Sequence, residues 1–258
     1  MGVITQITLK EVRELFPSFN ISTLTPTSSG VMDTTYITDK YIVKKYERDI
    51  DVNCDIELLN ILSANNLSVG TCIAQNGEWF LYTKLKGKEP KVISSFHIQA
   101  LARFLAAFHT QTQSMKCHSL FINNYDLKEI LNFTKVNYYF YYKKLQLLQN
   151  YKPQNDGFIH GDIFKDNTVF DRDKVGVFDF IDGGCGEFVF DIAVCLISFD
   201  AKKHSPYFIN LFLNTYNQKA PKKIKKAELI KTMEIASKFY ALLRIDKYRN
   251  PHKAKELL

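Results

Sequence analysis

The segment His160-Gly161-Asp162-Ile163-Phe164-Lys165-Asp166-Asn167 is the most informative part of this 258-residue sequence, and Asp179 follows it after a short interval. Segments of β-like composition flank it, at 157–160, 168–171 and 175–178. Its polar side chains are therefore expected on loops between short strands. Phosphoryl transfer needs such a set, with one carboxylate to accept a proton, and an asparagine and a second carboxylate to hold Mg²⁺ on phosphates.

The spacing of these residues also indicates phosphoryl transfer. Asp162 and Asn167 are separated as in the catalytic loop of the protein-kinase signature, and Asp179 stands where that signature has a second metal ligand. The sequence therefore predicts Asp162 as the catalytic residue, with Asn167 and Asp179 as ligands of Mg²⁺. A single His-x-Asp occurs by chance in many chains, so the prediction depends on the whole ordered set.

The amino-terminal part of the chain supplies a matching lysine. Alternating residues predict a hairpin of strands at 34–38 and 41–46, and Lys44 ends the Tyr-Ile-Val-Lys run of the second strand. A lysine in this position can reach the α- and β-phosphates of a nucleotide. The neighbouring Lys45 would point to the opposite face of the strand. Glu57, in a predicted helix, is either the partner that orients Lys44 or a solvated helix residue.

A polar segment before this hairpin is a candidate phosphate loop. Its hydroxyl and backbone N–H groups could contact phosphates, and the residues concerned are Ser28, Ser29 and Gly30. It is not a Walker loop, because Gly-x-x-x-x-Gly-Lys-(Ser/Thr) does not occur in the sequence.

The order of the predicted elements indicates an α+β fold. Strands dominate the first part, where Asn76-Gly77 is a strong hairpin turn signal, and helices are expected at 96–111, at 127–148 and from 191 onward. We expect a protein-kinase-like fold with two lobes. Residues 1–83 would form a small lobe with an antiparallel sheet, and residues 84–258 a larger helical lobe with the catalytic and metal loops. The aromatic run at 138–142 is expected in the core.

The composition suits a folded globular chain, with 46% hydrophobic and 24% charged residues and a net charge of +7. Residues 201–258 hold 14 Lys and Arg against 4 Asp and Glu, whereas the first 200 residues hold 20 against 23. Such a basic segment fits nucleic acid, an anionic membrane, acidic ligands or a solvated helical surface. The lysine run at 222–226 lacks arginine and interleaved aromatics, so we expect a solvated helix start, and no nucleic-acid or membrane partner.

Other features favour a cytoplasmic protein. The longest apolar run, 188–199, is interrupted by Asp191 and is too short to cross a bilayer. No basic region precedes an apolar run at the start of the chain. The five cysteines are odd in number and form no Cys-x-x-Cys pair, so we expect reduced thiols. The oligomeric state is not predicted.

With these motifs in place, the chain resembles the aminoglycoside phosphotransferase and choline kinase superfamily, and within it the type II homoserine kinases. Their catalytic segment typically reads His-(Ala/Gly)-Asp-Leu-Phe-x-Asp-Asn, close to 160–167 here. The segments 177–180 and 191–196 resemble the metal-ligand strand of that group and its following helix. The segment 29–36 looks like its phosphate-loop hairpin, and 105–109 is similar to the Leu-Ala-x-x-His helix of the superfamily.

The resemblance implies an ATP- and Mg²⁺-dependent kinase that phosphorylates the hydroxyl of a small molecule, with homoserine as the first choice. It implies that Asp162 is the catalytic base and that Asn167 and Asp179 hold Mg²⁺. Lys44 would bind the phosphates, oriented by Glu57.

The resemblance also implies supporting roles. His160 would brace the catalytic loop through hydrogen bonds, and Asp191 would anchor it from the start of a helix. The backbone of Thr83 and Leu85 would hold the adenine. Asp182 either contacts an amine of the acceptor or only caps a turn.

Three alternatives stay open at this point. The acceptor could be an aminoglycoside, a choline-like compound or a sugar alcohol, although a basic segment argues against polycationic acceptors. The chain could be a nucleotide-binding pseudokinase or interaction protein, but no expected catalytic or metal position is missing. It could also bind nucleic acid through its basic segment.

Overall fold

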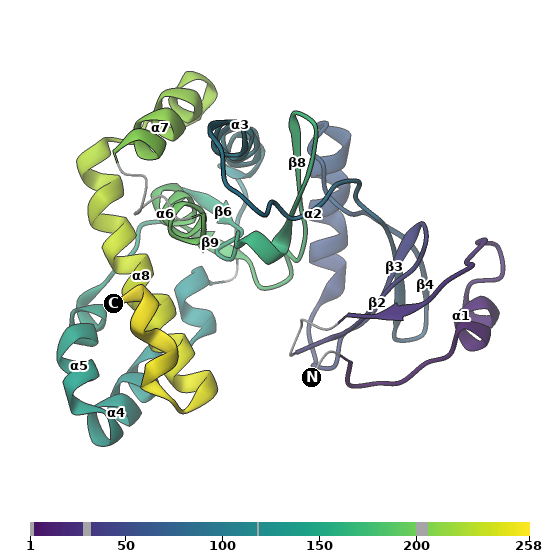
Figure 1. Ribbon diagram of the computed structural model, residues 1–258, viewed down its shortest axis with the longest axis horizontal. Coiled ribbons are helices and arrows are strands. Elements are labelled where there is room, and N and C mark those ends of the chain that lie inside the picture. Colours follow the sequence, from purple (N-terminus) through teal and green to yellow (C-terminus); the bar gives the residue numbers. More distant parts are fainter. Residues whose placement is uncertain (1–2, 28–31, 118, 200–205) are drawn as a thin grey trace. The chain divides into compact units, whose positions relative to one another are not determined.

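The computed structural model describes residues 3–27, 32–117, 119–199 and 206–258. The chain divides into two compact units (Figure 1), the first made of Met1–Gly87 with Gly176–Ile181 and the second of Lys88–Val175 with Asp182–Leu258. The division falls after Gly87, where we expected it after residue 83. The first unit also takes up a short segment from far along the chain, which the order of elements does not reveal.

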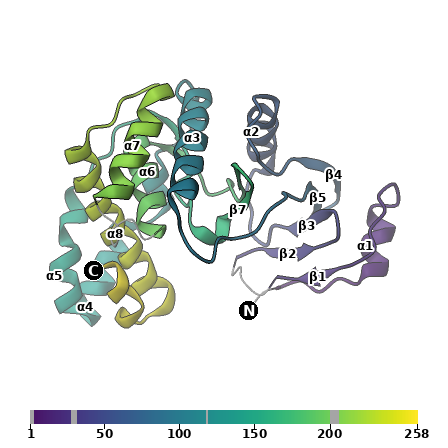
Figure 2. The same cartoon turned by 45° about the horizontal axis from the view of Figure 1, so that its top comes forward.

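The first unit is built on an antiparallel sheet. Five strands are hydrogen-bonded in the order β1-β2-β3-β5-β4, and the sheet is accompanied by helices α1 and α2 (Figure 2). The elements are α1 (Leu9–Leu15), β1 (Thr25–Pro26), β2 (Thr34–Ile37), β3 (Tyr41–Lys45), α2 (Val52–Ala64), β4 (Cys72–Asn76) and β5 (Trp79–Thr83). Both predicted hairpins are confirmed: Tyr36 lies opposite Val43, and Gly77 adopts the positive φ of +57° that the turn between β4 and β5 requires.

Helix α1 was not expected from the sequence. Thr8 caps it, because its side chain accepts from the N–H of Glu11 while the Glu11 carboxylate accepts from the N–H of Thr8. This reciprocal Thr-x-x-Glu arrangement is a sequence signal for a helix start that could have identified α1. The helix contributes Val12 to the core of the first unit, where it packs with Tyr36, Leu81 and their neighbours.

The second unit is mainly helical. Helix α7 packs on α3, and α8 packs on α6 (Figure 2). The α-helices are α3 (Ser95–Thr112), α4 (Leu127–Asn137), α5 (Tyr139–Leu145), α6 (Phe188–Ser198), α7 (Tyr207–Lys219) and α8 (Lys226–Tyr248). The 3₁₀-helices are η1 (Phe121–Asn124), η2 (Gln146–Asn150), η3 (Lys165–Asn167) and η4 (Pro251–Leu257). Strands β6 (Gly157–Ile159) and β9 (Gly184–Gly186) pair with each other, as do β7 (Thr168–Asp171) and β8 (Lys174–Val177), and the last two residues of β8 belong to the first unit.

The single helix expected over 127–148 is wrong. Tyr138, with φ −143° and ψ 56°, leaves the helical conformation and separates α4 from α5. The expectation that the aromatic run is core is also wrong for Tyr139 and Phe140, whose exposed fractions are 56% and 67%. A continuous helix would have turned one aromatic stripe toward the core, whereas the break directs these rings to the surface.

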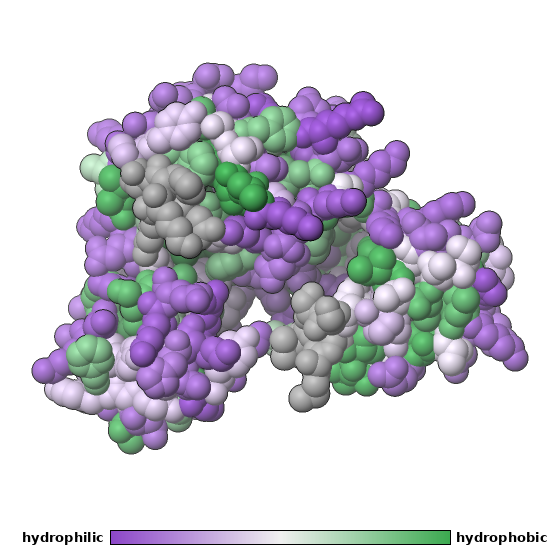
Figure 3. Space-filling view, in the orientation of Figure 1, coloured by the Kyte–Doolittle hydropathy of each residue, from purple (hydrophilic) through white to green (hydrophobic). Residues whose placement is uncertain are grey.

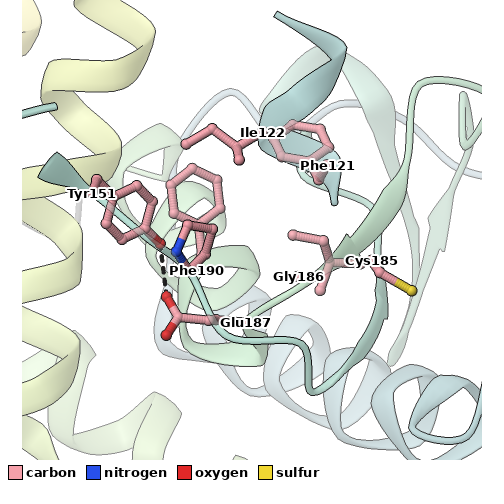
Figure 4. A pocket seen from close by; sticks show the side chains of 9 residues that line it. Phe121, Ile122, Tyr151, Cys185, Gly186, Glu187 and Phe190 are labelled. Atoms are coloured by element: carbon pink, nitrogen blue, oxygen red, sulfur yellow. Dashed lines mark hydrogen bonds between the residues drawn. The ribbon is translucent and has the colours of Figure 1, made fainter. Parts of the chain in front are cut away.

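A small cavity lies in the second unit (Figure 4). Its volume is about 10 Å³, and its walls are mostly apolar side chains such as Phe121 and Phe190. At its edge the hydroxyl of Tyr151 donates to Glu187 Oε2 over 2.7 Å. Space of this size holds one water molecule at most, so this cavity is not a substrate pocket.

The surface shown in Figure 3 is largely hydrophilic, with hydrophobic residues in separate patches. None of the helices in the described ranges is both long and apolar enough to cross a membrane.

The structure contains a disulfide that the sequence did not predict. Cys117 is bonded to Cys185, so the expectation of reduced thiols is wrong for this pair, whereas Cys54, Cys72 and Cys195 are free. The two partners are 68 residues apart in the sequence. Pairing of β6 with β9, together with a bridge from Leu120 to Cys185, brings them together. The spacing of the cysteines in the sequence does not indicate such contacts.

Replacing both Cys117 and Cys185 by Ser is expected to lower the free energy of unfolding. Because the bond closes a loop of 68 residues, chain entropy sets the loss at up to about 4 kcal/mol. Urea denaturation of the variant, with and without reductant, measures it, and Cys54→Ser at an exposed free thiol is the control. A wild-type protein equally stable with and without reductant would contradict the bond.

Candidate active site

A buried carboxylate holds the loop that follows β6. Asp191, in the first turn of α6, accepts from the N–H of Gly161 at Oδ1 over 2.8 Å and from the N–H of His160 at Oδ2 over 3.1 Å. Its Oδ2 also lies 3.2 Å from His109 Nε2, and His109 Nδ1 lies 2.8 Å from the hydroxyl of Tyr216. One carboxylate therefore connects the loop to α3, α6 and α7. The role of Asp191 as an anchor of the loop was a prediction from the sequence, and these are the contacts that the residue makes.

The ionisation of this pair follows from its surroundings. Burial by itself would raise the pKa of Asp191, but the hydrogen bonds from His109 and from the N–H of Gly161 hold it below its ordinary value. Burial lowers the pKa of His109. A neutral His109 with its proton on Nε2 donates to Asp191 and accepts from Tyr216 at Nδ1. Asp191 thus remains a carboxylate that accepts hydrogen bonds on both oxygens.

Asp162 is held by two residues of its own loop. Its N–H donates to His160 Nδ1 over 3.2 Å. Asn167, at the end of η3, donates from Nδ2 to Asp162 Oδ2 over 3.0 Å and to the Asp162 carbonyl over 2.9 Å. The amide nitrogen of Asn167 therefore orients the carboxylate of Asp162.

The first unit holds the predicted lysine. Lys44 Nζ lies 2.7 Å from Asp179 Oδ1, 3.7 Å from Asp33 Oδ2 and 4.5 Å from the ring centroid of Tyr46. Burial would lower the pKa of Lys44, but the negative charges of Asp179 and Asp33 outweigh it, and the pKa is raised. The ammonium group therefore stays charged. Lys45 pairs with Glu78 instead, as expected from the alternation of the strand.

Asp179 occupies an unusual backbone position. Its φ of +70° lies in the left-handed region, which costs a non-glycine residue free energy and is often found at functional sites. The preceding Val177 holds the segment in place, because its N–H donates to the carbonyl of Ser68 over 3.0 Å and it bridges to Val69. These contacts explain why a late segment of the chain carries Asp179 to the lysine of the first unit.

The residues present fit Mg²⁺. The carboxylate of Asp179 and the amide oxygen of Asn167 are hard oxygen donors, and Mg²⁺ takes one or two such groups together with phosphates and water. Within the described ranges, no group of three or more His, Cys, Asp or Glu side chains could hold an ion by itself.

The expected pair of Lys44 with Glu57 is not formed. Glu57 is exposed on α2, and the ion pairs found for Lys44 run to Asp179 and Asp33. The buried side of α2 carries Asp55, Leu58, Leu59 and Leu62, which recur at helical spacing. Glu57 lies off that side, whereas the charge of Asp55, after burial itself, raises the pKa of Tyr46. The hydrophobic stripe of α2 was the signal that could have identified Asp55.

The structure gives few contacts for the other residues that the sequence predicts at the site. The candidate phosphate-loop residues Ser28, Ser29 and Gly30 lie outside the described residues. Thr83 ends β5, where its N–H donates to the carbonyl of Thr71 over 2.9 Å, and Leu85 is half-buried nearby in the sequence. The carbonyl of Asp182 accepts from Asn124 Nδ2 over 3.2 Å.

Two residues near the predicted site were missed by the sequence analysis. Asp33, the second carboxylate beside Lys44, also accepts from the N–H of Glu47 over 3.3 Å. Tyr240, from the distant helix α8, donates its hydroxyl to the carbonyl of Gly161. Asp33 lies in the segment 29–36 that resembles the phosphate-loop hairpin, but neither residue belongs to a spaced motif that would single it out.

Comparisons with known proteins agree with this chemistry. A family model described as phosphotransferase enzyme family matches residues 23–212. A homoserine kinase of Polaromonas naphthalenivorans (strain CJ2) is 22% identical over 100% of this chain and 93% of its own length. A homoserine kinase of Sinorhizobium fredii (strain NBRC 101917 / NGR234) is 26% identical over 81% of this chain and 74% of its own.

A solved structure supports the fold. An aminoglycoside phosphotransferase in complex with GDP and kanamycin superposes with a TM-score of 0.70, at 16% identity, over 96% of this chain and 94% of that one. The expected protein-kinase-like α+β fold is therefore confirmed.

Gly161→Ala is expected to be more destabilising than Gly77→Ala. Both glycines have positive φ, so either substitution costs about 1–2 kcal/mol in backbone strain. A Cβ at Gly161 would lie 2.2 Å from the buried ring of Phe121, whereas one at Gly77 meets nothing within 4 Å. The clash adds about 1–3 kcal/mol.

Urea denaturation of the two variants measures the difference. The variant Phe121→Ala/Gly161→Ala, in which the ring is absent, should lose less stability than the two single changes together. Equal destabilisation by Gly161→Ala and Gly77→Ala would show that the ring does not constrain the loop.

Proposed function

Because the chain belongs to the phosphotransferase enzyme family, we propose that it transfers the γ-phosphoryl group of ATP to the hydroxyl of homoserine. The observation that carries this choice of acceptor is that two curated relatives, aligned over most of their length, are both homoserine kinases. The basic composition of 201–258 suits an acceptor that bears a carboxylate.

In the proposed reaction, Asp162 acts on the acceptor. Its carboxylate orients the hydroxyl and takes its proton while the hydroxyl oxygen bonds to the γ-phosphorus and the bond to the leaving ADP breaks. The hydrogen bond from Asn167 Nδ2 to Asp162 Oδ2 limits the directions in which the carboxylate can point. Catalysis of this kind depends on position and charge more than on covalent chemistry.

The other residues bind the nucleotide. Lys44 stays charged and would contact the phosphates, as would the backbone and hydroxyls of Ser28, Ser29 and Gly30. Asn167 and Asp179 would hold Mg²⁺, which when bound neutralises charge on the phosphates. In this proposal, the backbone of Thr83 and Leu85 binds the adenine, and Asp182 contacts the amine of the acceptor.

An aminoglycoside is the second candidate acceptor. It is favoured by the likeness of the fold to the phosphotransferase in complex with kanamycin. Against it, residues 201–258 hold 14 Lys and Arg but only 4 Asp and Glu, which does not favour a polycationic acceptor.

An acceptor panel tests the proposal. With Mg-ATP, we expect ADP release and a product one phosphoryl group heavier with homoserine, and neither with kanamycin or choline. Asp162→Asn should lower kcat with homoserine about 1000-fold, because the carboxylate that takes the proton is lost, while nucleotide binding changes little.

The outcomes separate the alternatives. Turnover with kanamycin and not with homoserine would establish the second candidate. Full activity of Asp162→Asn would refute the role of Asp162. Binding of Mg-ATP with no turnover for any acceptor would support a pseudokinase.

A further inference from the structure

The peptide group between Gly161 and Asp162 has a side-chain partner at each end. Its carbonyl accepts from the hydroxyl of Tyr240 on α8. Its N–H donates to His160 Nδ1 over 3.2 Å. The peptide before it is held as well, since the N–H of Gly161 donates to Asp191. The plane of the peptide group that leads into Asp162 is therefore fixed from two sides.

Tyr240 itself has little freedom. It is 8% exposed, and its ring contacts that of Phe164 at 4.8 Å between centroids and that of Phe239 at 5.2 Å. Burial, with the negative charge of Asp162 next, raises the pKa of Tyr240 well above its ordinary value. The hydroxyl therefore stays protonated and donates. The side chain is buried, and its hydroxyl also interacts with the side chain of Asp162.

The left-handed backbone of Gly161 makes this contact possible. Its φ of +74° is a conformation that favours glycine, and here the Gly161 carbonyl meets the hydroxyl from α8. Since the peptide group is planar, the direction of that carbonyl also sets the direction of the N–H of Asp162 and the conformation about its N–Cα bond. A rotation of this plane would swing the side chain of Asp162.

We propose that Tyr240 is a positioning residue of the catalytic loop, which orients the carboxylate of Asp162 by holding the carbonyl of Gly161. The effect of Tyr240 on kcat rests on the proposed function, whereas its hydrogen bond to the loop does not. A shift of a catalytic group by about 1 Å can lower a rate about 100-fold, so one hydroxyl in this place is sufficient for a large effect. Tyr240 lies beyond the residues 23–212 that match the family model. Through Tyr240, helix α8 would help to orient the carboxylate of Asp162.

Tyr240→Phe tests the proposal, because it removes the hydroxyl and keeps the ring packing. Tyr151→Phe is the matched control, since it removes another largely buried hydroxyl of the same unit, which donates to Glu187 over 2.7 Å. For each full-length variant, four quantities are measured: kcat, KM for homoserine, Kd for Mg-ATP, and hydrogen exchange of the Asp162 amide.

For Tyr240→Phe we expect kcat to fall about 10- to 100-fold, KM and Kd to stay within about twofold, and the Asp162 amide to exchange faster. Tyr151→Phe should match the wild type in all four. Wild-type kcat and exchange in Tyr240→Phe would overturn the proposal. A raised KM for homoserine with unchanged kcat would also overturn it, because the hydroxyl would then serve binding.

Two further results are decisive. Equal losses of kcat and of thermal midpoint in both variants would mean that any buried hydroxyl matters equally, and would overturn the proposal. A wild-type protein that phosphorylates no acceptor would refute the proposed function, while exchange of the Asp162 amide would still decide whether Tyr240 holds the loop.

Discussion

The conformation of the loop that carries Asp162 depends on the buried carboxylate of Asp191. A buried carboxylate is costly unless hydrogen bonds replace the water it has lost. Here those bonds come from the N–H groups of His160 and Gly161 and from His109. Two of these three hydrogen bonds form only when the loop adopts its observed backbone conformation. The free-energy cost of burying the charge therefore favours that conformation.

The same carboxylate ties distant parts of the second unit together. His109 on α3 stacks on Phe188 with 4.1 Å between ring centroids, and its other nitrogen contacts Tyr216 on α7. Tyr240 holds the loop from α8. Asp191 and Tyr240 thus contact the loop directly, and His109 and Tyr216 support Asp191 from behind, so a network of four helices holds the loop that carries Asp162.

Much of the site could be predicted from the sequence, because local chemistry encodes it. The order Lys44, Asp162, Asn167 and Asp179 is visible in spacing alone, and the strand alternation that separated Lys44 from Lys45 is confirmed. The features that could not be predicted depend on long-range packing. The burial of Asp55 and the exposure of Glu57 follow from which side of α2 faces the core, and the disulfide of Cys117 follows from strand pairing.

If the charge of Asp191 maintains the loop, Asp191→Asn must disturb both the stability of the protein and the protection of the loop. The substitution keeps the shape of the side chain but turns one acceptor oxygen into a donor that faces N–H groups. We predict a loss of about 3–5 kcal/mol in the free energy of unfolding by urea, together with faster hydrogen exchange at the amides of His160 and Gly161. A variant as stable as the wild type, with both amides still protected, would contradict the account.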